Sequence, residues 1–444
     1  MSKVRLELLR LAMPVLIQSF IGMLMFMSDT AMLGRLGENS KFALTAMGIV
    51  GPIMWLLEVL SMALGTGALS LVARKTGGNE KDESRIFGAL AIRISLLAGC
   101  VIGLTFSLGA RVIVRFFTDD SVVIETTTPY IQVLAGGIVS LFVVQAASGT
   151  LYGAGDTLRP MIAGIISNIV NIVSNYLLIF GKFGFPRLEV RGAALATTIS
   201  FTLYAVIVVS FCFRKRGTIG IRFKDQRLST SSHFRNLMRV VLPATVQPLI
   251  FNTGYVFFSR IVMAYGITIM AAHRVAIAVE SLSFIPGGAF AVATASLFGK
   301  YLGAQDETNA KKVAQEAFVI NAIVMSFASL ILALFPSVLS RIFTDDSAII
   351  ELSSIALRIW AFEQLPLAFT MTFEGVFRGA GATEFPLISG AIGVWLARIL
   401  PSYIFLSGKM AVQFIWMTTI LDWLTQACIL YIFYKTGCWR RVKA

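Results

Sequence analysis

The sequence predicts an all-α membrane protein built from two parallel repeats of six helices. Hydrophobic residues make up 56% of the 444-residue chain, charged residues only 14%, and the mean hydropathy is +0.78. A soluble protein usually carries about 25% charged residues, so a soluble fold is excluded. Apolar stretches of about 20 residues recur along the chain, and each is long enough to cross a bilayer as a helix.

The repeat is visible in three pairs of segments, each separated by 226 positions. Arg115-Phe-Phe-Thr-Asp-Asp120 returns as Arg341-Ile-Phe-Thr-Asp-Asp346, Gly153-Ala-Gly-Asp-Thr157 returns as Gly379-Ala-Gly-Ala-Thr383, and Pro160 returns as Pro386. The second half is therefore a duplicate of the first. In duplicated transporters the interface between the halves is where substrates usually bind.

We expect twelve transmembrane helices, each an apolar run between more polar connections. In chain order they cover residues 11–34, 43–72, 86–112, 128–152, 161–181, 191–213, 240–264, 268–298, 313–338, 350–377, 385–407 and 411–436. Several exceed the required length, so we expect them to tilt or protrude. The first run is too long for the apolar region of a signal peptide.

Basic residues gather in alternate connections, which predicts the orientation. They are Lys3, Arg5 and Arg10; Arg74, Lys75, Lys81 and Arg85; Arg214, Lys215, Arg216, Arg222, Lys224, Arg227, Arg235 and Arg239; Lys300, Lys311 and Lys312; and Arg440, Arg441 and Lys443. The positive-inside rule places these connections and both termini in the cytoplasm of a multi-pass protein of the plasma or inner membrane. With six helices per half, the two repeats enter the membrane in the same direction.

The expected domains are an N-lobe at 1–213, a basic cytoplasmic linker at 214–239 and a C-lobe at 240–444. We expect His233, within the linker, to be a solvated loop residue. The net charge of +14 lies in short connections, where it orients a membrane protein, so we expect no nucleic-acid partner. Four cysteines without CxxC spacing indicate neither a disulfide framework nor a zinc site.

Charges inside predicted helices are the strongest functional candidates, because burying a charge in lipid is costly unless it faces protein or water. Asp29 lies deep in the first apolar run. A carboxylate there can bind Na⁺, or carry a proton if desolvation favours its neutral form. The alternative is a structural carboxylate that hydrogen-bonds to neighbouring helices.

Three amides follow one stripe of the fifth helix: Asn168, Asn171 and Asn175. Their spacing places them on one helical face. Such a stripe predicts either a polar cavity wall or an interhelical network that holds the helices together.

In the second half, Glu280 precedes Pro286 in the eighth helix, and kinked helices commonly line transporter sites. We expect Glu280 to attract a cationic substrate or to form a second coupling site. His273 and Arg274, two turns earlier, are candidates to neutralise it. Further intramembrane charges are Glu58, Glu363, Glu374, Arg398 and Asp422. We expect Arg398 to anchor an acidic residue or a helix end, and Glu374 to pair with Arg378.

The repeated glycine motif and its surroundings resemble a known family. Gly149-Thr-Leu-Tyr-Gly-Ala-Gly-Asp-Thr157 and Gly375-Val-Phe-Arg-Gly-Ala-Gly-Ala-Thr383 resemble the helix 4–5 junction and its second copy in the multidrug and toxic compound extrusion (MATE) transporters. Gly65 to Arg74 and Glu280 to Ala304 resemble the family's helices 2 and 8. The resemblance covers essentially the whole chain and is closest to the prokaryotic type.

The resemblance implies a two-lobed antiporter with a central V-shaped cavity that opens alternately to each side. It implies export of organic, often cationic and amphipathic, compounds against an inward flow of H⁺ or Na⁺, with no other cofactor. Asp29 matches the N-lobe aspartate used for cation coupling in archaeal and bacterial members, and Thr197 matches a helix 6 hydroxyl near it. Many members carry aspartate at the position of Asn175. The glutamate that some carry in helix 7 has no counterpart between residues 240 and 264, which favours N-lobe coupling.

Two other functions are weighed against a drug antiporter. A flippase for lipid-linked saccharides, from a related two-lobed family, should line its cavity with basic residues, whereas the intramembrane charges here are mainly acidic. A membrane-embedded enzyme should show a motif such as HExxH, and none is present; a Walker A motif is also absent. We therefore expect a monomeric transporter of small organic molecules in the lipid bilayer, not an enzyme, with no metal site beyond possible Na⁺ at Asp29.

Overall fold

The computed structural model describes residues 2–36, 40–215 and 217–440, and within them all regular secondary structure is helical. Arg216, Arg441 and Lys443, which belong to the basic clusters, lie outside the described residues. The first half of the chain forms α1 (Lys3–Gly34), α2 (Ser40–Gly77), α3 (Lys81–Phe117), α4 (Ser121–Gly153), α5 (Leu158–Phe180) and α6 (Glu189–Phe213).

The second half is divided into more pieces. After the short 3₁₀ helix η2 (Phe223–Gln226) come α7 (Ser231–Met263), α8 (Ile267–Gly303), α9 (Glu307–Leu334), α10 (Pro336–Ser340), α11 (Ser347–Ala361) and α12 (Gln364–Gly379). They are followed by α13 (Glu384–Ile392), the π-helix η3 (Gly393–Ile399), α14 (Leu400–Ser407), α15 (Val412–Lys435) and η4 (Cys438–Arg440).

Eleven helices in the described part of the chain are long and apolar enough to cross a membrane. The all-α membrane fold is thus confirmed. Most helices extend several residues past their predicted ends, since apolar patterning marks the span and not the polar turns that continue it. In particular, α7 begins at Ser231, inside the predicted linker.

The expected helix at 350–377 is broken in two. The expected spans at 313–338 and 385–407 are also divided, the first into α9 and α10 and the second into α13, η3 and α14. α11 ends at Ala361 and α12 starts at Gln364. Between them the backbone makes 3₁₀-type hydrogen bonds: the Phe362 amide donates to the Ile359 carbonyl at 3.1 Å, and the Glu363 amide to the Trp360 carbonyl at 3.2 Å. Pro366 explains the break, because its ring lacks an N–H and clashes with the carbonyl four residues earlier, that of Phe362.

His233 is not the solvated loop residue we expected. It lies in the first turn of α7, where its side chain is only 13% exposed. Its Nε2 lies 3.0 Å from Glu83 Oε2, and its ring packs edge-on against Phe87 of α3, with centroids 5.1 Å apart. The end of the linker is therefore part of the folded unit.

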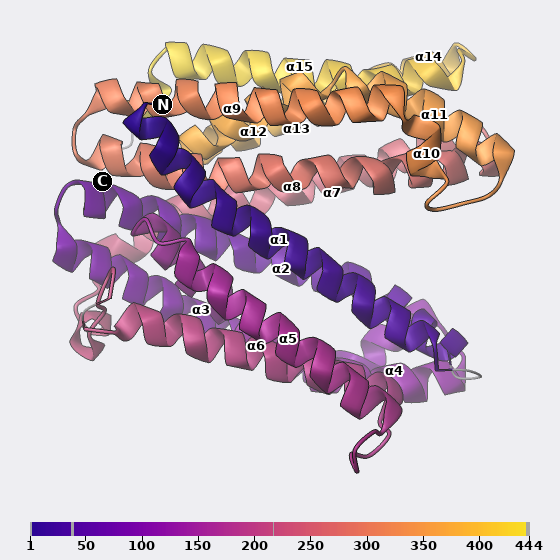
Figure 1. Ribbon diagram of the computed structural model, residues 1–444, viewed down its shortest axis with the longest axis horizontal. Coiled ribbons are helices and arrows are strands. Elements are labelled where there is room, and N and C mark those ends of the chain that lie inside the picture. The colour runs from indigo at the N-terminus through magenta and orange to yellow at the C-terminus, as the bar shows by residue number, and fades with distance from the viewer. Residues whose placement is uncertain (1, 37–39, 216, 441–444) are drawn as a thin grey trace. The chain divides into compact units, whose positions relative to one another are not determined.

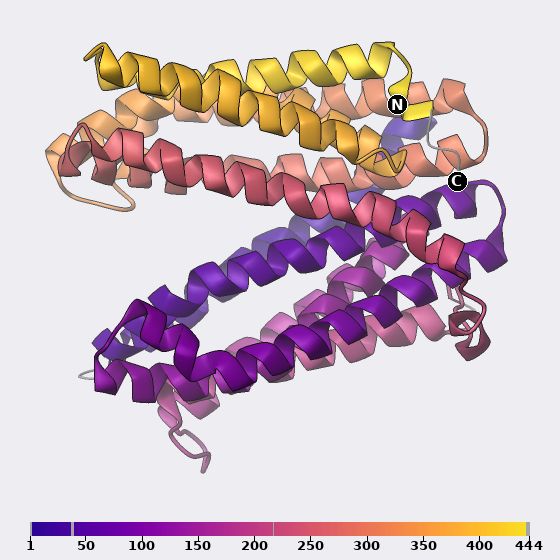
Figure 2. The same ribbon diagram turned by 180° about the vertical axis from the view of Figure 1, so that it is seen from behind.

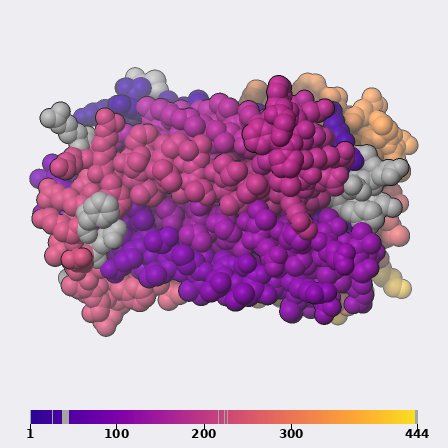
Figure 3. All heavy atoms as spheres, turned by 90° about the horizontal axis from the view of Figure 1, so that it is seen from below, coloured from indigo at the N-terminus to yellow at the C-terminus, as the bar shows by residue number. Residues whose placement is uncertain are grey.

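The helices form two compact units, one of residues 13–238 and one of residues 1–12 together with 239–444. In the first unit, α4 contacts α2, α3 and α6. The purple helices α3 and α4, joined by a short turn, run next to each other (Figure 2). Figure 3 shows one face of this unit, on which purple and magenta segments from distant parts of the sequence lie against each other.

The duplicated glycines make the same helix contact in each unit. A methyl group on Gly149 would overlap the Gly65 backbone of α2, and one on Gly375 would overlap the Ala291 backbone of α8. One turn further on, a methyl group on Gly153 would overlap the Leu69 backbone, and one on Gly379 would overlap the Ala295 backbone. Small residues spaced four apart let membrane helices pack backbone against backbone. The repeated motif therefore conserves one close helix crossing per unit.

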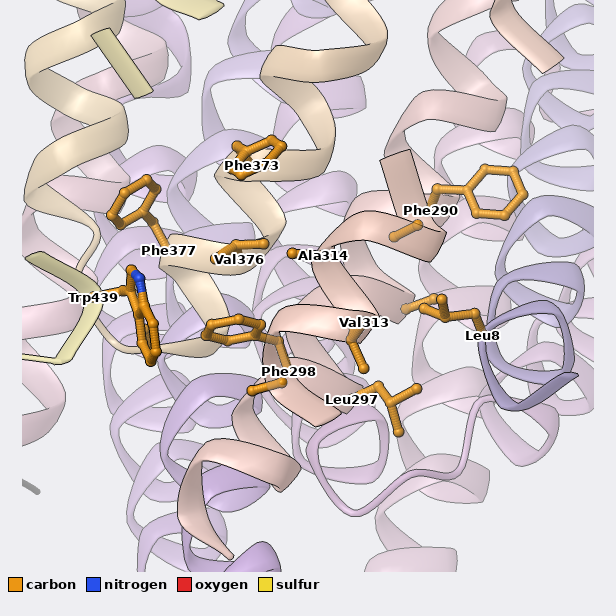
Figure 4. Packing of buried hydrophobic residues seen from close by; sticks show 14 of the residues in the cluster. Leu8, Phe290, Leu297, Phe298, Val313, Ala314, Phe373, Val376, Phe377 and Trp439 are labelled. Atoms are coloured by element: carbon orange, nitrogen blue, oxygen red, sulfur yellow. The ribbon is translucent and has the colours of Figure 1, made fainter. Parts of the chain in front are cut away.

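The second unit is built around α8, α9 and α12, which run side by side (Figure 1). Its main apolar cluster includes Phe298 of α8, Val313 of α9 and Phe377 of α12. Leu8, from the first turns of α1, also belongs to it and is fully buried (Figure 4). Arg5 adds an ion pair to Glu316, with 2.7 Å between Nη2 and Oε2. The first twelve residues thus fold with the second unit, although α1 continues unbroken into the first.

Candidate functional site

The first polar site joins three helices of the unit formed by residues 13–238. Asp29 is half-buried on α1, and Asn175 Nδ2 of α5 donates to its Oδ1 over 2.6 Å. The same Nδ2 donates to Asn171 Oδ1 at 3.0 Å, and Asn171 Nδ2 donates to Ser200 Oγ of α6 at 3.3 Å. The side chains of Asn171, Asn175 and Ser200 are fully buried. A single hydrogen-bonded chain therefore links α1, α5 and α6.

One acceptor in this chain has no partner. Among the described residues, Asn175 Oδ1 is buried and receives no hydrogen bond. A buried carbonyl oxygen normally has a donor, and leaving it without one is costly. Together with the Asp29 carboxylate it offers two oxygen ligands of the type that hard cations prefer.

Two predicted members of this site lie at its edge. Asn168 is partly buried on the same face of α5, and the structure gives it no hydrogen bond to another described residue. Thr197 takes part through its backbone, since its carbonyl accepts from Ser200 Oγ at 2.9 Å. Sequence reasoning missed Ser200. Its position three residues after Thr197, on the same face of α6, was the available signal.

The second polar site lies in the other unit, at the break between α11 and α12. Glu363 sits in the break and is 2% exposed, and the Thr419 hydroxyl of α15 donates to its Oε2. On α8, the carboxyl group of Glu280, which is 8% exposed, is close enough to interact electrostatically with that of Glu363, and its Oε1 has no hydrogen-bond partner among the described residues. The structure therefore brings Glu280 to a partner that the sequence did not identify.

An ion pair completes this site. Arg398 Nε lies 2.8 Å from Asp422 Oδ2, and Gln426 Nε2 donates to Asp422 Oδ1 at 2.8 Å. The guanidinium also faces the rings of Phe251 (5.5 Å), Phe258 (5.6 Å) and Trp423 (5.9 Å from the centroids). The expectation that Arg398 anchors an acid is confirmed.

The backbone of η3 allows Asp422 of α15 to come close to Arg398. η3 is a π-helix that begins at Gly393, and a methyl group on this glycine would overlap Asp422 and Gln426. π-Helical turns are rare and often occur at functional sites. The widened turn and the missing side chain bring α15 close to η3, so that Arg398 on the next turn meets the carboxylate.

Of the two basic candidates near Glu280, only His273 is buried. His273 is 1% exposed and packs edge-on between Phe258 and Trp360, with centroids 5.6 Å from each. Neither ring nitrogen has a hydrogen-bond partner among the described residues. Arg274 instead is exposed and donates to the Tyr255 hydroxyl at 3.1 Å, so the structure does not bring it to Glu280.

Each unit also carries a glutamine-centred network at matching positions of α1 and α7. Gln18 Nε2 donates to the Tyr204 hydroxyl at 2.5 Å and its Oε1 accepts from Tyr152 at 3.0 Å. Gln247 Nε2 donates to Glu374 at 2.7 Å, and Arg378 holds the other Glu374 oxygen at 2.8 Å. The predicted Glu374–Arg378 pair is confirmed. Both units thus keep the glutamine, but its partners differ: two tyrosine hydroxyls surround Gln18, and a glutamate–arginine pair stands beside Gln247.

Comparisons with known proteins agree on one kind of protein. The sequence profile of the MatE family matches residues 14–177 and 243–404. The chain is 30% identical to a probable multidrug resistance protein NorM of Thermotoga maritima, over 99% of this chain and 94% of the relative. It is 24% identical to an uncharacterized transporter, YisQ, of Bacillus subtilis, over 98% and 94% of the two chains.

Solved structures share the fold. A MOP superfamily transporter from Pyrococcus furiosus superimposes with a TM-score of 0.89 at 22% identity, covering 99% of this chain and 98% of that one. A MATE protein crystallised in complex with MaL6 gives a TM-score of 0.90 at 22% identity, again over 99% and 98%. Among the described residues, no group of three His, Cys, Asp or Glu side chains is arranged to bind a metal ion.

Proposed function

Because the chain belongs to the MatE family of membrane transporters, we propose that it exports small organic compounds in exchange for H⁺ or Na⁺. Its homologues are transporters and not enzymes, and the NorM relative is named for multidrug resistance. We extend that activity to this chain and expect mainly cationic or amphipathic substrates. Export would proceed by alternating access between the two units.

The observation that carries this proposal is the buried chain from Asp29 through Asn175 to Asn171. It ties a carboxylate to three membrane-spanning helices, α1, α5 and α6, and leaves a buried carbonyl oxygen without a donor. Intramembrane carboxylates commonly mark ion pathways. We assign ion coupling to Asp29, Asn171 and Asn175, with Thr197 and Asn168 at the edge of the site.

Either ion would change the same hydrogen bond. Na⁺ bound between the Asp29 carboxylate and the free Asn175 oxygen would add ligands from α1 and α5 to one ion. A proton on Asp29 would convert a charge-assisted hydrogen bond from Asn175 into a weaker neutral one. In both cases the contact between α1 and α5 changes, and through Ser200 the change reaches α6. Substrate bound in that unit would then be released outward.

The charge balance of the two polar sites favours a cationic substrate. Both sites contain carboxyl groups, and Arg398, the guanidinium of the second site, is already held by Asp422 at 2.8 Å. A flippase for lipid-linked saccharides would need unpaired basic groups for pyrophosphate, so it remains the less favoured alternative. We propose Glu280 and Glu363 as a secondary polar site, with His273 beside it.

Orientation and assembly are part of the same proposal. We place the protein in the plasma or inner membrane as a monomer with both termini in the cytoplasm, following the positions of the basic residues. We propose 1–213, 214–239 and 240–444 as N-lobe, linker and C-lobe, with the difference that residues 1–12 group with the second unit and that α7 already begins at Ser231.

The test is transport by purified protein in proteoliposomes, under a proton gradient and a sodium gradient imposed separately. The probe is ethidium, a planar organic cation whose fluorescence reports its position. Wild type should move ethidium under at least one gradient. Asp29→Asn keeps an acceptor for Asn175 and should stay folded, but it should lose gradient-driven transport.

Val173→Ala is the matched control, because Val173 lies on α5 between Asn171 and Asn175, is 52% exposed and belongs to neither polar site. It should transport like wild type. Full gradient-driven transport by Asp29→Asn would overturn the assignment of coupling to Asp29. If Glu280→Gln lost transport while Asp29→Asn kept it, coupling would belong to the second polar site instead.

A further inference from the structure

We propose that the unit containing residues 239–444 binds the phosphate group of an anionic phospholipid in a pocket between the ends of α9 and α15. The pocket has a volume of about 260 Å³. Its lining comes from α9, from the last turn of α15 and from η4; the residues used below are Lys311, Gln315, Tyr434, Lys435, Trp439 and Arg440.

The charge in this pocket is positive and only partly neutralised. Lys311, Lys435 and Arg440 bring three cations from three elements. One carboxylate serves two of them: Glu307 Oε2 lies 2.7 Å from Arg440 Nη2 and 3.9 Å from Lys311 Nζ. Among the described residues, no carboxylate lies within ion-pair distance of Lys435. About two positive charges are therefore available to an anion.

The pocket is held in place before any ligand arrives. Trp439 is 2% exposed, its Nε1 donates to the Tyr434 carbonyl at 3.1 Å, and its ring packs on Phe298 (5.5 Å). Figure 4 shows Trp439 seated beside Phe298 and Phe377. Arg440 lies over the Trp439 ring, with Cζ 4.9 Å from its centroid. The buried Trp439 ring thus fixes the position of the Arg440 guanidinium.

The position of the pocket at the ends of two membrane-spanning helices suits the depth of lipid headgroups. Lys311 is in the second turn of a membrane-spanning helix and Lys435 is the last residue of another. Deeper along α9, Val319 and Ile323 are exposed (42% and 66%), and on the Lys435 face of α15 Leu424 is exposed (44%). Each of the two lysines therefore stands at the end of a helix whose deeper turns expose apolar side chains suited to acyl chains. Basic pockets between transmembrane helices bind anionic headgroups in this way.

An anionic phospholipid fits these features better than a free anion does. Its phosphate diester would lie among Lys311, Lys435 and Arg440 while its acyl chains cover the exposed apolar faces below. A phosphatidylcholine headgroup carries its own cation, which would be repelled by Lys435. Inorganic phosphate shares the anionic chemistry but has nothing to bury against α9 and α15.

The test is native mass spectrometry of the full-length protein in detergent. It is mixed with phosphatidylglycerol, with phosphatidylcholine of the same chain length, or with inorganic phosphate alone. Wild type should retain phosphatidylglycerol and not phosphatidylcholine. Lys311→Gln and Lys435→Gln should each weaken phosphatidylglycerol binding about fivefold. Lys312→Gln is the matched control, because Lys312 is the next residue on α9, is exposed and does not line the pocket.

Glu307→Gln provides a variant whose effect cannot come from misfolding. It removes the one carboxylate that competes for Lys311 and Arg440, so it should tighten phosphatidylglycerol binding. Equal losses in Lys311→Gln and Lys312→Gln, or no gain in Glu307→Gln, would mean that overall charge and not this pocket holds the lipid. Inorganic phosphate that binds as tightly as the lipid and displaces it would show a soluble-anion site and overturn the lipid assignment.

Discussion

The Asn175 amide donates to the Asp29 carboxylate over 2.6 Å and, from the same nitrogen, to Asn171 over 3.0 Å. An amide nitrogen is the only part of an asparagine that can meet two oxygen acceptors, so this geometry fixes its orientation. Asn175 cannot titrate. Of the pair, only Asp29 can gain or lose a proton, and Asn175 acts by setting where that carboxylate points.

Replacing Asn175 by alanine should therefore damage both stability and coupling. Asp29 loses its donor and Asn171 loses one of its bonds, which should lower the free energy of unfolding by about 1–3 kcal/mol. Val173→Ala, at an exposed position on the same helix, should change it by less than about 0.5 kcal/mol. Thermal unfolding in detergent and ethidium transport measure the two effects. Equal behaviour of both variants would argue against a special role for Asn175.

The Arg398–Asp422 pair predicts a strong coupling between two mutations. Both side chains are buried, so Arg398→Leu leaves an uncompensated carboxylate and should cost about 3–5 kcal/mol. Asp422→Leu should cost a similar amount. The double variant removes both charges and should be closer to wild type than either single one, as a double-mutant cycle of unfolding free energies would show. Arg274→Leu, at an exposed arginine, is the control and should be nearly neutral.

The neighbouring buried carboxyl groups of Glu280 and Glu363 predict that glutamine and alanine differ at position 280. Glutamine presents a donor to Glu363, so Glu280→Gln should unfold near the wild-type temperature. Glu280→Ala removes the partner of a buried carboxylate and should lose about 1–3 kcal/mol. If both variants are equally stable in a detergent melt, the two carboxyl groups do not depend on each other.

The repeated Thr-Asp-Asp motif predicts a pair of equivalent helix caps. Asp120 Oδ1 accepts from the Val122 and Val123 amides at 2.8 and 3.2 Å, and Asp346 does the same for α11 at 2.9 and 3.2 Å. Alanine at either position should cost about 0.5–2 kcal/mol. Alanine at the preceding aspartates, Asp119 and Asp345, removes the same charge without a cap. These two substitutions should hardly change the free energy of unfolding, measured by thermal unfolding in detergent. If they cost as much stability as the substitutions at Asp120 and Asp346, loss of charge and not loss of a helix cap would explain the effect.

Sequence reasoning reached the first polar site because its geometry is local. Asn171 and Asn175 are one helical turn apart, so their shared face follows from spacing alone, and Asp29 stood out as a charge in an apolar run. The second site depends on packing between distant elements. Glu363, Arg398 and Asp422 were visible as intramembrane charges, but their grouping requires the break before Pro366 and the π-helical turn at Gly393, which hydropathy does not encode.

The same limit applies to the start of the chain. Apolar periodicity marks residues 11–34 as a span but does not say which unit the preceding turn joins. Val4 and Leu8 are at helical spacing and buried among residues of α8, α9 and α12. Only the folded structure shows that this short segment completes the core of the second unit.

Severing the chain between its two units would therefore not yield two self-sufficient halves. A fragment starting at Arg239 would lack Val4, Leu8 and Leu11, and would leave Glu316 without Arg5. Its core would show an apolar gap that only the other fragment can fill. Complementation between separately expressed halves should thus depend on the first twelve residues. These residues belong to the N-terminal fragment but complete the apolar core of the C-terminal one.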